Sequence, residues 1–241
     1  MGPKVDESMA NAESHILDNP VWSALTGPQS PIAEVNGLAR RYPPEVSPFS
    51  AIADVYDPQA WRDLAELIGP GGTAVLTGRL LNIPDDWQVL GGGTGVQLIG
   101  DAVEGREDHD ALELGVDDVP EMLDLVSRTQ PGPFLPRTIE LGGYLGFRID
   151  GVLVAIAGCR VHPTGWREIS TVCTDPAHQG KGLAGRLVRA VAAGIRAEGD
   201  LPFLHASTNN ENAIRLYEAL GFRLRSRSTF AAVKAPSTQD S

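Results

Sequence analysis

The chain has 241 residues, of which 42% are hydrophobic and 21% are charged, and its formal net charge at pH 7 is −11. This length allows one or two domains with a buried core, and the lack of any run of 18 apolar residues argues against a membrane span. All of the net negative charge lies in residues 1–110, which argues against a nucleic-acid partner. The preferred interpretation is a solvated acidic surface that aids solubility, and the alternative is a surface that attracts cationic amines.

The first 105 residues contain few regular patterns. Residues 1–20 are polar, lack the apolar core of a signal peptide, and are predicted to form a flexible tail of a cytoplasmic protein. Residues 21–105 are predicted to form an N-terminal α/β region, with helices near 33–42 and over 58–68 and a strand over 73–77. The glycine-rich run at 91–95 predicts a hairpin-like turn, because no helix pattern follows it as a dinucleotide-binding loop requires.

Strands and helices alternate more clearly after an acidic linker over residues 101–110. Strands are predicted over 112–116, 139–149, 152–162, 167–174, 202–207 and 222–233. Helices are predicted over 117–127, 183–197 and 210–220, and residues 129–138 are predicted to form a loop. The dipeptide Asp150-Gly151 is typical of a tight hairpin turn, and the segment 163–165 predicts the next turn.

The segment Gln179-Gly180-Lys181-Gly182-Leu183-Ala184 lies between a predicted strand and a predicted helix. The first N–H groups of a helix lack internal partners, and the helix dipole adds partial positive charge there, so a phosphate group binds well at this point. The two glycines allow a ligand to approach the backbone closely, and Lys181 adds a positive charge. The spacing fits neither a Walker loop nor a Rossmann loop. The alternative interpretation is a tight turn into a surface helix.

A second motif, Asn-x-x-Ala-Ile-x-Leu-Tyr-Glu-x-Leu-Gly-Phe, runs from Asn210 to Phe222. Asn210 is suited to an N-cap, and Gly221 is suited to end the helix. Together with the pattern Gln-x-x-Gly-x-Ala about 30 residues upstream, this motif resembles the GNAT N-acetyltransferases, and the C-terminal half is most similar to their FR47-type branch. The resemblance covers residues 111–234 and implies a GNAT domain over 111–236. The implied fold is α/β (α+β), with a mixed, mostly antiparallel sheet flanked by helices.

The resemblance implies that acetyl-CoA is the co-substrate. The residues expected to hold it are Val172, Cys173, Thr174, Gln179, Gly180, Lys181, Gly182, Leu183, Ala184, Asn210 and Asn212, and a backbone N–H near Val172 is expected to stabilise the oxyanion. Gln179 stands where the family often has arginine, which removes one positive charge that Lys181 would replace. No metal is expected, because both cysteines, Cys159 and Cys173, lie in predicted strands without a ligand pattern.

Two residues are candidates for proton transfer. Tyr217 is expected to protonate the leaving CoA thiolate, and Glu168, placed like the base glutamate of the histone-acetyltransferase branch, to deprotonate the amine. The alternatives are a core tyrosine and an exposed or ion-paired strand glutamate. His162 and His205 are further candidate bases. A covalent mechanism on Cys173 is disfavoured, since a thiol in an apolar strand is usually inert.

Several interpretations of function remain open. The leading one is an acetyltransferase, monomeric or homodimeric, that acetylates a primary amine of a small molecule by direct attack. The alternatives are a protein N-terminal or lysine acetyltransferase and a non-catalytic acyl-CoA-binding sensor; the presence of Tyr217 beside an intact glycine loop favours an enzyme. Residues 21–105 carry no recognisable motif and are interpreted as a degenerate GNAT-like half, a lid or a dimerisation module.

Overall fold

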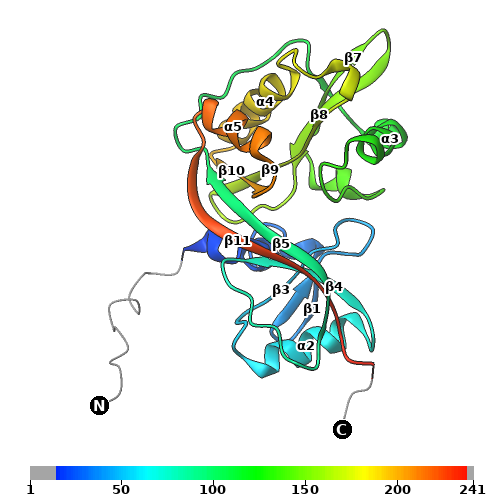
Figure 1. Cartoon of the computed structure of the whole chain (residues 1–241), viewed down its shortest axis with the longest axis vertical. Helices are drawn as coiled ribbons and strands as arrows, with labels where there is room; N and C mark the ends of the chain where they lie inside the picture. The colour runs from blue at the N-terminus through cyan, green and yellow to red at the C-terminus, as the bar shows by residue number, and fades with distance from the viewer. Residues whose placement is uncertain (1–14, 238–241) are drawn as a thin grey trace.

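A single eight-stranded sheet runs through both lobes of the molecule (Figure 1). The computed structural model describes residues 15–237, so residues 1–14 of the predicted tail lie outside it. In spatial order the strands are β4 (Thr73–Gly78), β11 (Arg223–Lys234), β5 (Gln88–Ile99), β10 (Leu201–Ser207), β9 (Trp166–Thr174), β8 (Val152–Cys159), β7 (Leu145–Ile149) and β6 (Leu112–Glu113). All neighbours are antiparallel except β9 and β10, which run parallel.

Helices cover both faces of the sheet in the C-terminal lobe. On one face lie α4 (Leu183–Ala197) and α5 (Glu211–Ala219), and the fully buried Leu187 of α4 belongs to the same core as Leu204 of β10. On the other face lies α3 (Val119–Thr129), where Met122 packs in a core with Ile156 of β8. The predicted architecture of a mixed, mostly antiparallel sheet flanked by helices is therefore confirmed.

The N-terminal lobe contains η2 (Ile16–Asp18), α1 (Pro20–Leu25), η3 (Ser30–Ile32), α2 (Pro58–Ile68) and a separate antiparallel sheet. That sheet consists of β1 (Glu34–Asn36), β2 (Ala39–Arg41) and β3 (Ser50–Ile52). The long strands β5 and β11 connect this lobe to the other one (Figure 1). Residues 15–20, predicted to be part of the tail, are instead folded, since Leu17 is buried in the core.

The helix predicted near 33–42 is wrong, because this segment forms the β1–β2 hairpin. The dipeptide Asn36-Gly37, a strong hairpin signal, lies at its turn, and Gly37 has a φ of 46°. The helix prediction overlooked this local turn signal.

The turn predicted at residues 91–95 is also wrong, because these glycines lie inside β5 and pair with β11. Close packing explains Gly92 and Gly95, whereas a Cβ on Gly91 or Gly93 would meet no atom within 4 Å. A Cβ on Gly95 would lie 2.5 Å from the Phe230 ring and 2.9 Å from the Ala206 carbonyl oxygen. Glycine in a strand often marks such a close approach.

Most other predicted elements are confirmed within a few residues, including α2, β4, α4, β10 and α5. Three strands are shorter than predicted, the last of them being β8, which ends at Cys159 and not at residue 162. The first ends at Glu113, since Val116–Asp118 forms the 3-10 turn η4. The predicted strand over 139–149 begins only at Leu145, because Thr138–Leu141 forms η5 and two glycines with positive φ follow it. None of the helices within residues 15–237 is both long enough and apolar enough to cross a bilayer.

Candidate active site

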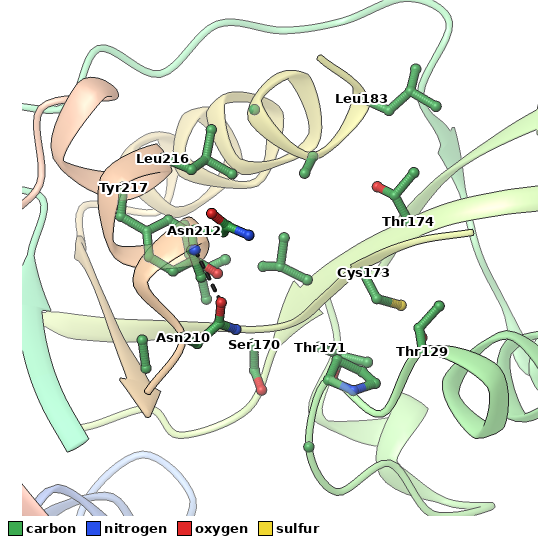
Figure 2. A pocket seen from close by; sticks show the side chains of 18 of the residues that line it. Thr129, Ser170, Thr171, Cys173, Thr174, Leu183, Asn210, Asn212, Leu216 and Tyr217 are labelled. Carbon is green, nitrogen blue, oxygen red and sulfur yellow. Dashed lines mark hydrogen bonds between the residues drawn. The ribbon is translucent and has the colours of Figure 1, made fainter. Parts of the chain in front are cut away.

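The site begins where the two parallel strands separate. The register of β9 and β10 runs from Trp166 paired with Leu201 to Glu168 paired with Phe203 and then stops. Beyond that point the strands border a cavity of about 910 Å³. Figure 2 shows Tyr217 and Asn212 on the α5 side of this cavity and Thr174 with Leu183 at its other end. A volume of this size is typical of a ligand pocket.

A β-bulge lies in the wall that β9 contributes. Ile156 of β8 pairs with Cys173, and Gly158 pairs with Ser170, so Thr171 and Val172 have no register partner on β8. Thr171 has a φ of 55°, which is a strained conformation for a β-branched residue. Among the described residues, these two have no partner on β10 either. The bulge therefore leaves backbone groups of β9 free to pair with a ligand in the cavity.

The glycine turn before α4 forms one end of the cavity. Gly180 and Gly182 have φ values of 74° and 75°, and Gly182 is the N-cap of α4. The first residues of α4 line the cavity, which places the positive end of the helix dipole there. Lys181 does not line the cavity; its Nζ lies 3.3 Å from Nδ1 of His178.

An unpaired polar atom lies in a residue of the cavity wall. The Oγ1 atom of Thr174 is buried and has no hydrogen-bond partner within residues 15–237, although Thr174 lines the cavity wall. Buried polar atoms without a partner are uncommon. The polar strand edge, the glycine turn and the helix start fit an extended molecule with phosphates at one end, which is the shape of the expected acetyl-CoA.

Helix α5 contributes three polar side chains. Asn210 caps the helix, its Oδ1 accepting a hydrogen bond from the Ala213 N–H at 3.1 Å, and Asn212 accepts one from Arg215 at 2.6 Å. Tyr217 is 7% exposed, and burial raises its pKa to about 12. The raised pKa keeps its hydroxyl protonated at neutral pH. Because the hydroxyl has no hydrogen-bond partner among the described residues, it is free to donate into the cavity.

The cavity thus brings together most of the residues predicted from the sequence. They are Val172, Cys173, Thr174, Gln179, Gly180, Gly182, Leu183, Ala184, Asn210, Asn212 and Tyr217. The two that do not line it are Lys181 and Glu168. Burial raises the pKa of the Cys173 thiol to about 11, and a thiol that stays protonated is a poor nucleophile.

Glu168 is poorly placed to act directly as the base. Its side chain is 1% exposed and makes two hydrogen bonds with Arg160, from Nε to Oε2 and from Nη2 to Oε1, each 3.0 Å long. Its Oε1 also lies 2.8 Å from Nδ1 of His205. Burial alone would raise the pKa of Glu168, but Arg160 and His205 outweigh it and lower the pKa to about 2. The geometry therefore favours the ion-paired alternative over the predicted base.

Both candidate histidines, His205 and His162, are already hydrogen-bonded to other side chains. His205 lines the cavity, but its Nε2 lies 3.1 Å from Nε2 of Gln97. Because Arg225 donates to Oε1 of Gln97, the amide nitrogen faces His205 and can only donate. His205 Nε2 is then the acceptor, and Nδ1 donates to Glu168. His162 does not line the cavity and is bonded to Asp200 at 2.6 Å.

Two residues of this polar network were missed from the sequence. Gln97 belongs to the N-terminal region and stands in the otherwise apolar run 96–99, which was the available signal for a buried polar contact. Arg160 follows β8 and lines the cavity, but no motif includes it. Its guanidinium contacts Glu168 of β9 and the ring of Phe49, which lie in separate segments, so its role depends on the tertiary structure.

The chain is similar to known proteins along its length. The sequence model of the family described as FR47-like protein matches residues 144–231. A crystal structure from Novosphingobium aromaticivorans DSM 12444, described as an acetyltransferase from the GNAT family, is 41% identical with a TM-score of 0.85 and covers 93% of this chain and 100% of that one. A GCN5-related N-acetyltransferase from Kribbella flavida shares the fold, with a TM-score of 0.61 at 16% identity over 94% of this chain and 98% of that one.

Two curated proteins match shorter stretches. The N-alpha-acetyltransferase RimI of Mycobacterium tuberculosis is 37% identical over 84 residues, which are 33% of this chain and 51% of RimI. The mycothiol acetyltransferase of Thermomonospora curvata is 37% identical over 75 residues, which are 30% of this chain and 25% of that protein. The chain therefore spans about half of the first relative and a quarter of the second.

Proposed function

The chain belongs to the GNAT family of acetyltransferases, and we propose that it transfers an acetyl group from acetyl-CoA to the primary amine of a small molecule. One observation carries the proposal. A single cavity joins the glycine turn at the start of α4 to the free hydroxyl of Tyr217. The reaction requires a helix start that binds the phosphates of the co-substrate at one end of the cavity and a proton donor for the leaving thiolate at the other.

The cavity wall offers a place for each part of the co-substrate. The turn from Gln179 to Ala184 would hold the pyrophosphate with backbone N–H groups. The peptide groups from Val172 to Thr174 would pair with the pantetheine arm as an added strand does, and Asn210 and Asn212 would contact the same arm. A backbone N–H of the bulge near Val172 would stabilise the oxyanion.

Bound acetyl-CoA supplies a thioester, whose C–S bond breaks as the amine nitrogen forms the new C–N bond. Tyr217 would give its hydroxyl proton to the departing thiolate, and the proton that the new amide nitrogen loses would return to the phenolate through water. The amine must be neutral to attack, and Glu168 is held in its ion pair, so we assign the removal of the amine proton to water. The value of kcat/KM should then rise with pH until the acceptor amine itself is neutral.

A protein acceptor is the second candidate, because RimI matches 84 residues of the chain. The similarity to mycothiol acetyltransferase has the same identity over 75 residues, so the two relatives do not decide between the acceptors. A sensor without catalysis is disfavoured, since binding alone would not require the unpaired phenol of Tyr217 in the cavity.

The test of the proposed function combines a binding assay with a turnover assay. Acetyl-CoA should raise the Tm of the purified protein, because a ligand that binds the folded state stabilises it by mass action. Thiol release should then appear with some members of a panel of small amines. A shift in Tm with turnover only on peptide N-termini or lysines would favour the second candidate, and no shift at saturating acetyl-CoA would refute the proposal.

Substitution Gly182→Ala tests the assigned pyrophosphate end. A side chain at a φ of 75° costs about 1–2 kcal/mol, and the displaced N–H groups should weaken acetyl-CoA binding at least about tenfold. The matched control is Gly165→Ala, since Gly165 has a φ of 77° with open space around it but does not line the cavity. Titration calorimetry should show weaker binding only in Gly182→Ala; equal binding by both variants would contradict the assignment.

A further inference from the structure

The cavity has two chemically different ends. Gly182 and Thr174 lie at one end, and Arg160 and His205 lie near the point where β9 and β10 meet. The strand from Glu168 to Thr174 separates these ends by roughly 20 Å. If the pyrophosphate binds at Gly182, as the proposed function holds, the acceptor has to approach the thioester from the end near Arg160.

The charge of the cavity wall differs from that of the whole protein. Although the chain has a net charge of −11, no Asp or Glu is among the residues that line this cavity in the described part of the chain. The wall contains Arg160, His178 and His205. This lining offers no carboxylate to bind an ammonium group, and the cation at the acceptor end is Arg160, whose partner Glu168 lies behind the lining.

The guanidinium of Arg160 is rigidly held but only partly used. It lies 4.7 Å from the centroid of the Phe49 ring, its side chain is 10% exposed, and its Nε and Nη2 donate to Glu168. A guanidinium has five N–H groups in a planar fork, so this pairing uses one edge and two of the donors. Within residues 15–237, Nη1 donates to no protein group. The second edge, made by Nη1 and the other N–H of Nη2, is therefore available on a residue that lines the cavity.

We propose that this second edge of Arg160 binds a carboxylate of the acceptor, so that the acceptor is an amino acid or another small amine that carries a carboxylate. The proposal rests on the proposed function and narrows its acceptor. Arginine is suited to planar, two-point recognition of carboxylates, and Glu168 fixes the orientation of the fork. A residue within a protein has its α-carboxylate converted to an amide, so this anchor favours a free molecule over a protein acceptor.

Matched acceptors test the proposal on the unmodified protein. Thiol release from acetyl-CoA is measured with common L-amino acids, with their primary amides and with their decarboxylated amines. The pH is set for each acceptor so that the same fraction of its amine is neutral. A charge-assisted pair should give at least one amino acid a kcat/KM about 10- to 150-fold above that of its amide. Turnover that is equal or faster with every amide and decarboxylated amine would overturn the inference and leave the acetyltransferase function intact.

The substitution Arg160→Lys tests whether the preference for carboxylate acceptors comes from this side chain. Lysine keeps the charge but loses the two-point edge, so the ratio between carboxylate and amide acceptors should fall toward one. The control is Arg223→Lys, since Arg223 is 61% exposed, pairs with Asp101 and does not line the cavity. The shift in Tm with acetyl-CoA shows whether the variant still folds and binds. A ratio that stays unchanged in a folded Arg160→Lys protein would contradict the role of Arg160. A failure of the unmodified protein to acetylate any amine would instead refute the proposed function.

Discussion

The substitution Tyr217→Phe is expected to lower kcat by about 10²- to 10⁴-fold, the range typical of a lost general acid. Phenylalanine keeps the ring that packs at 6.0 Å from Phe222 and removes only the hydroxyl. That hydroxyl has no hydrogen-bond partner among the described residues, so its loss should change neither the fold nor the affinity for acetyl-CoA. Rapid-mixing measurements of thiol release, together with titration of acetyl-CoA, separate the two effects.

The control for this change is Tyr56→Phe, because Tyr56 is 64% exposed and does not line the cavity. The pH profile adds a second check. With its pKa raised to about 12, Tyr217 stays protonated throughout the neutral and mildly alkaline range, so it should cause no decline in kcat below about pH 10. A kcat of Tyr217→Phe near that of the unmodified enzyme would show that water protonates the thiolate.

The substitution Glu168→Ala is expected to have the largest effect on stability. It leaves the buried guanidinium of Arg160 without its partner, and the removal of one member of a buried pair costs about 3–5 kcal/mol. For a chain of this size the Tm should fall by roughly 6–20 °C. Urea unfolding and calorimetry measure the loss. The control Glu211→Ala breaks the surface pair with Arg215, in which both side chains are well exposed, and should change stability by less than about 1 kcal/mol.

The contribution of Glu168 should also depend on pH in a defined direction. Its pKa is about 2 in the folded protein against an ordinary value of 4.5, so the folded state favours the carboxylate. The stabilisation is complete above about pH 4.5 and is lost as the pH falls from there toward 2. The difference in unfolding free energy between the unmodified protein and Glu168→Ala should therefore be smaller near pH 3 than near pH 7. A constant difference would show that the ion pair is not its source.

The local patterns around residues 179–184 and 210–222 were sufficient to predict the family, the sheet with its flanking helices and most of the cavity wall. These motifs work because the relevant contacts are local. A glycine turn before a helix and a capping asparagine act through neighbouring backbone groups. The family membership that they implied is confirmed by a relative of 41% identity that the chain covers completely.

The surroundings of Glu168 could not be predicted in the same way. Its spacing from Gln179 matched a family base, but spacing does not show that Arg160 and His205 pair with it. The contact between Gln97 and His205 joins residues 108 positions apart. The glycines of β5 were likewise misinterpreted, because Phe230 and Ala206, whose proximity requires Gly95, lie far along the chain.

The position of β5 between β10 and β11 has a consequence for synthesis on the ribosome. Gln97 pairs with His205 and with Ser226, so β5 must wait for strands that are translated after more than 100 further residues. At 5–20 residues per second, the interval between Ile99 and Ser207, the end of β10, is roughly 5–22 s. During that time both edges of β5 lack their partners, a state that favours pairing with other nascent chains. The glycines at 91–93 and 95 have low strand propensity, and they should delay such wrong pairing until the C-terminal strands emerge.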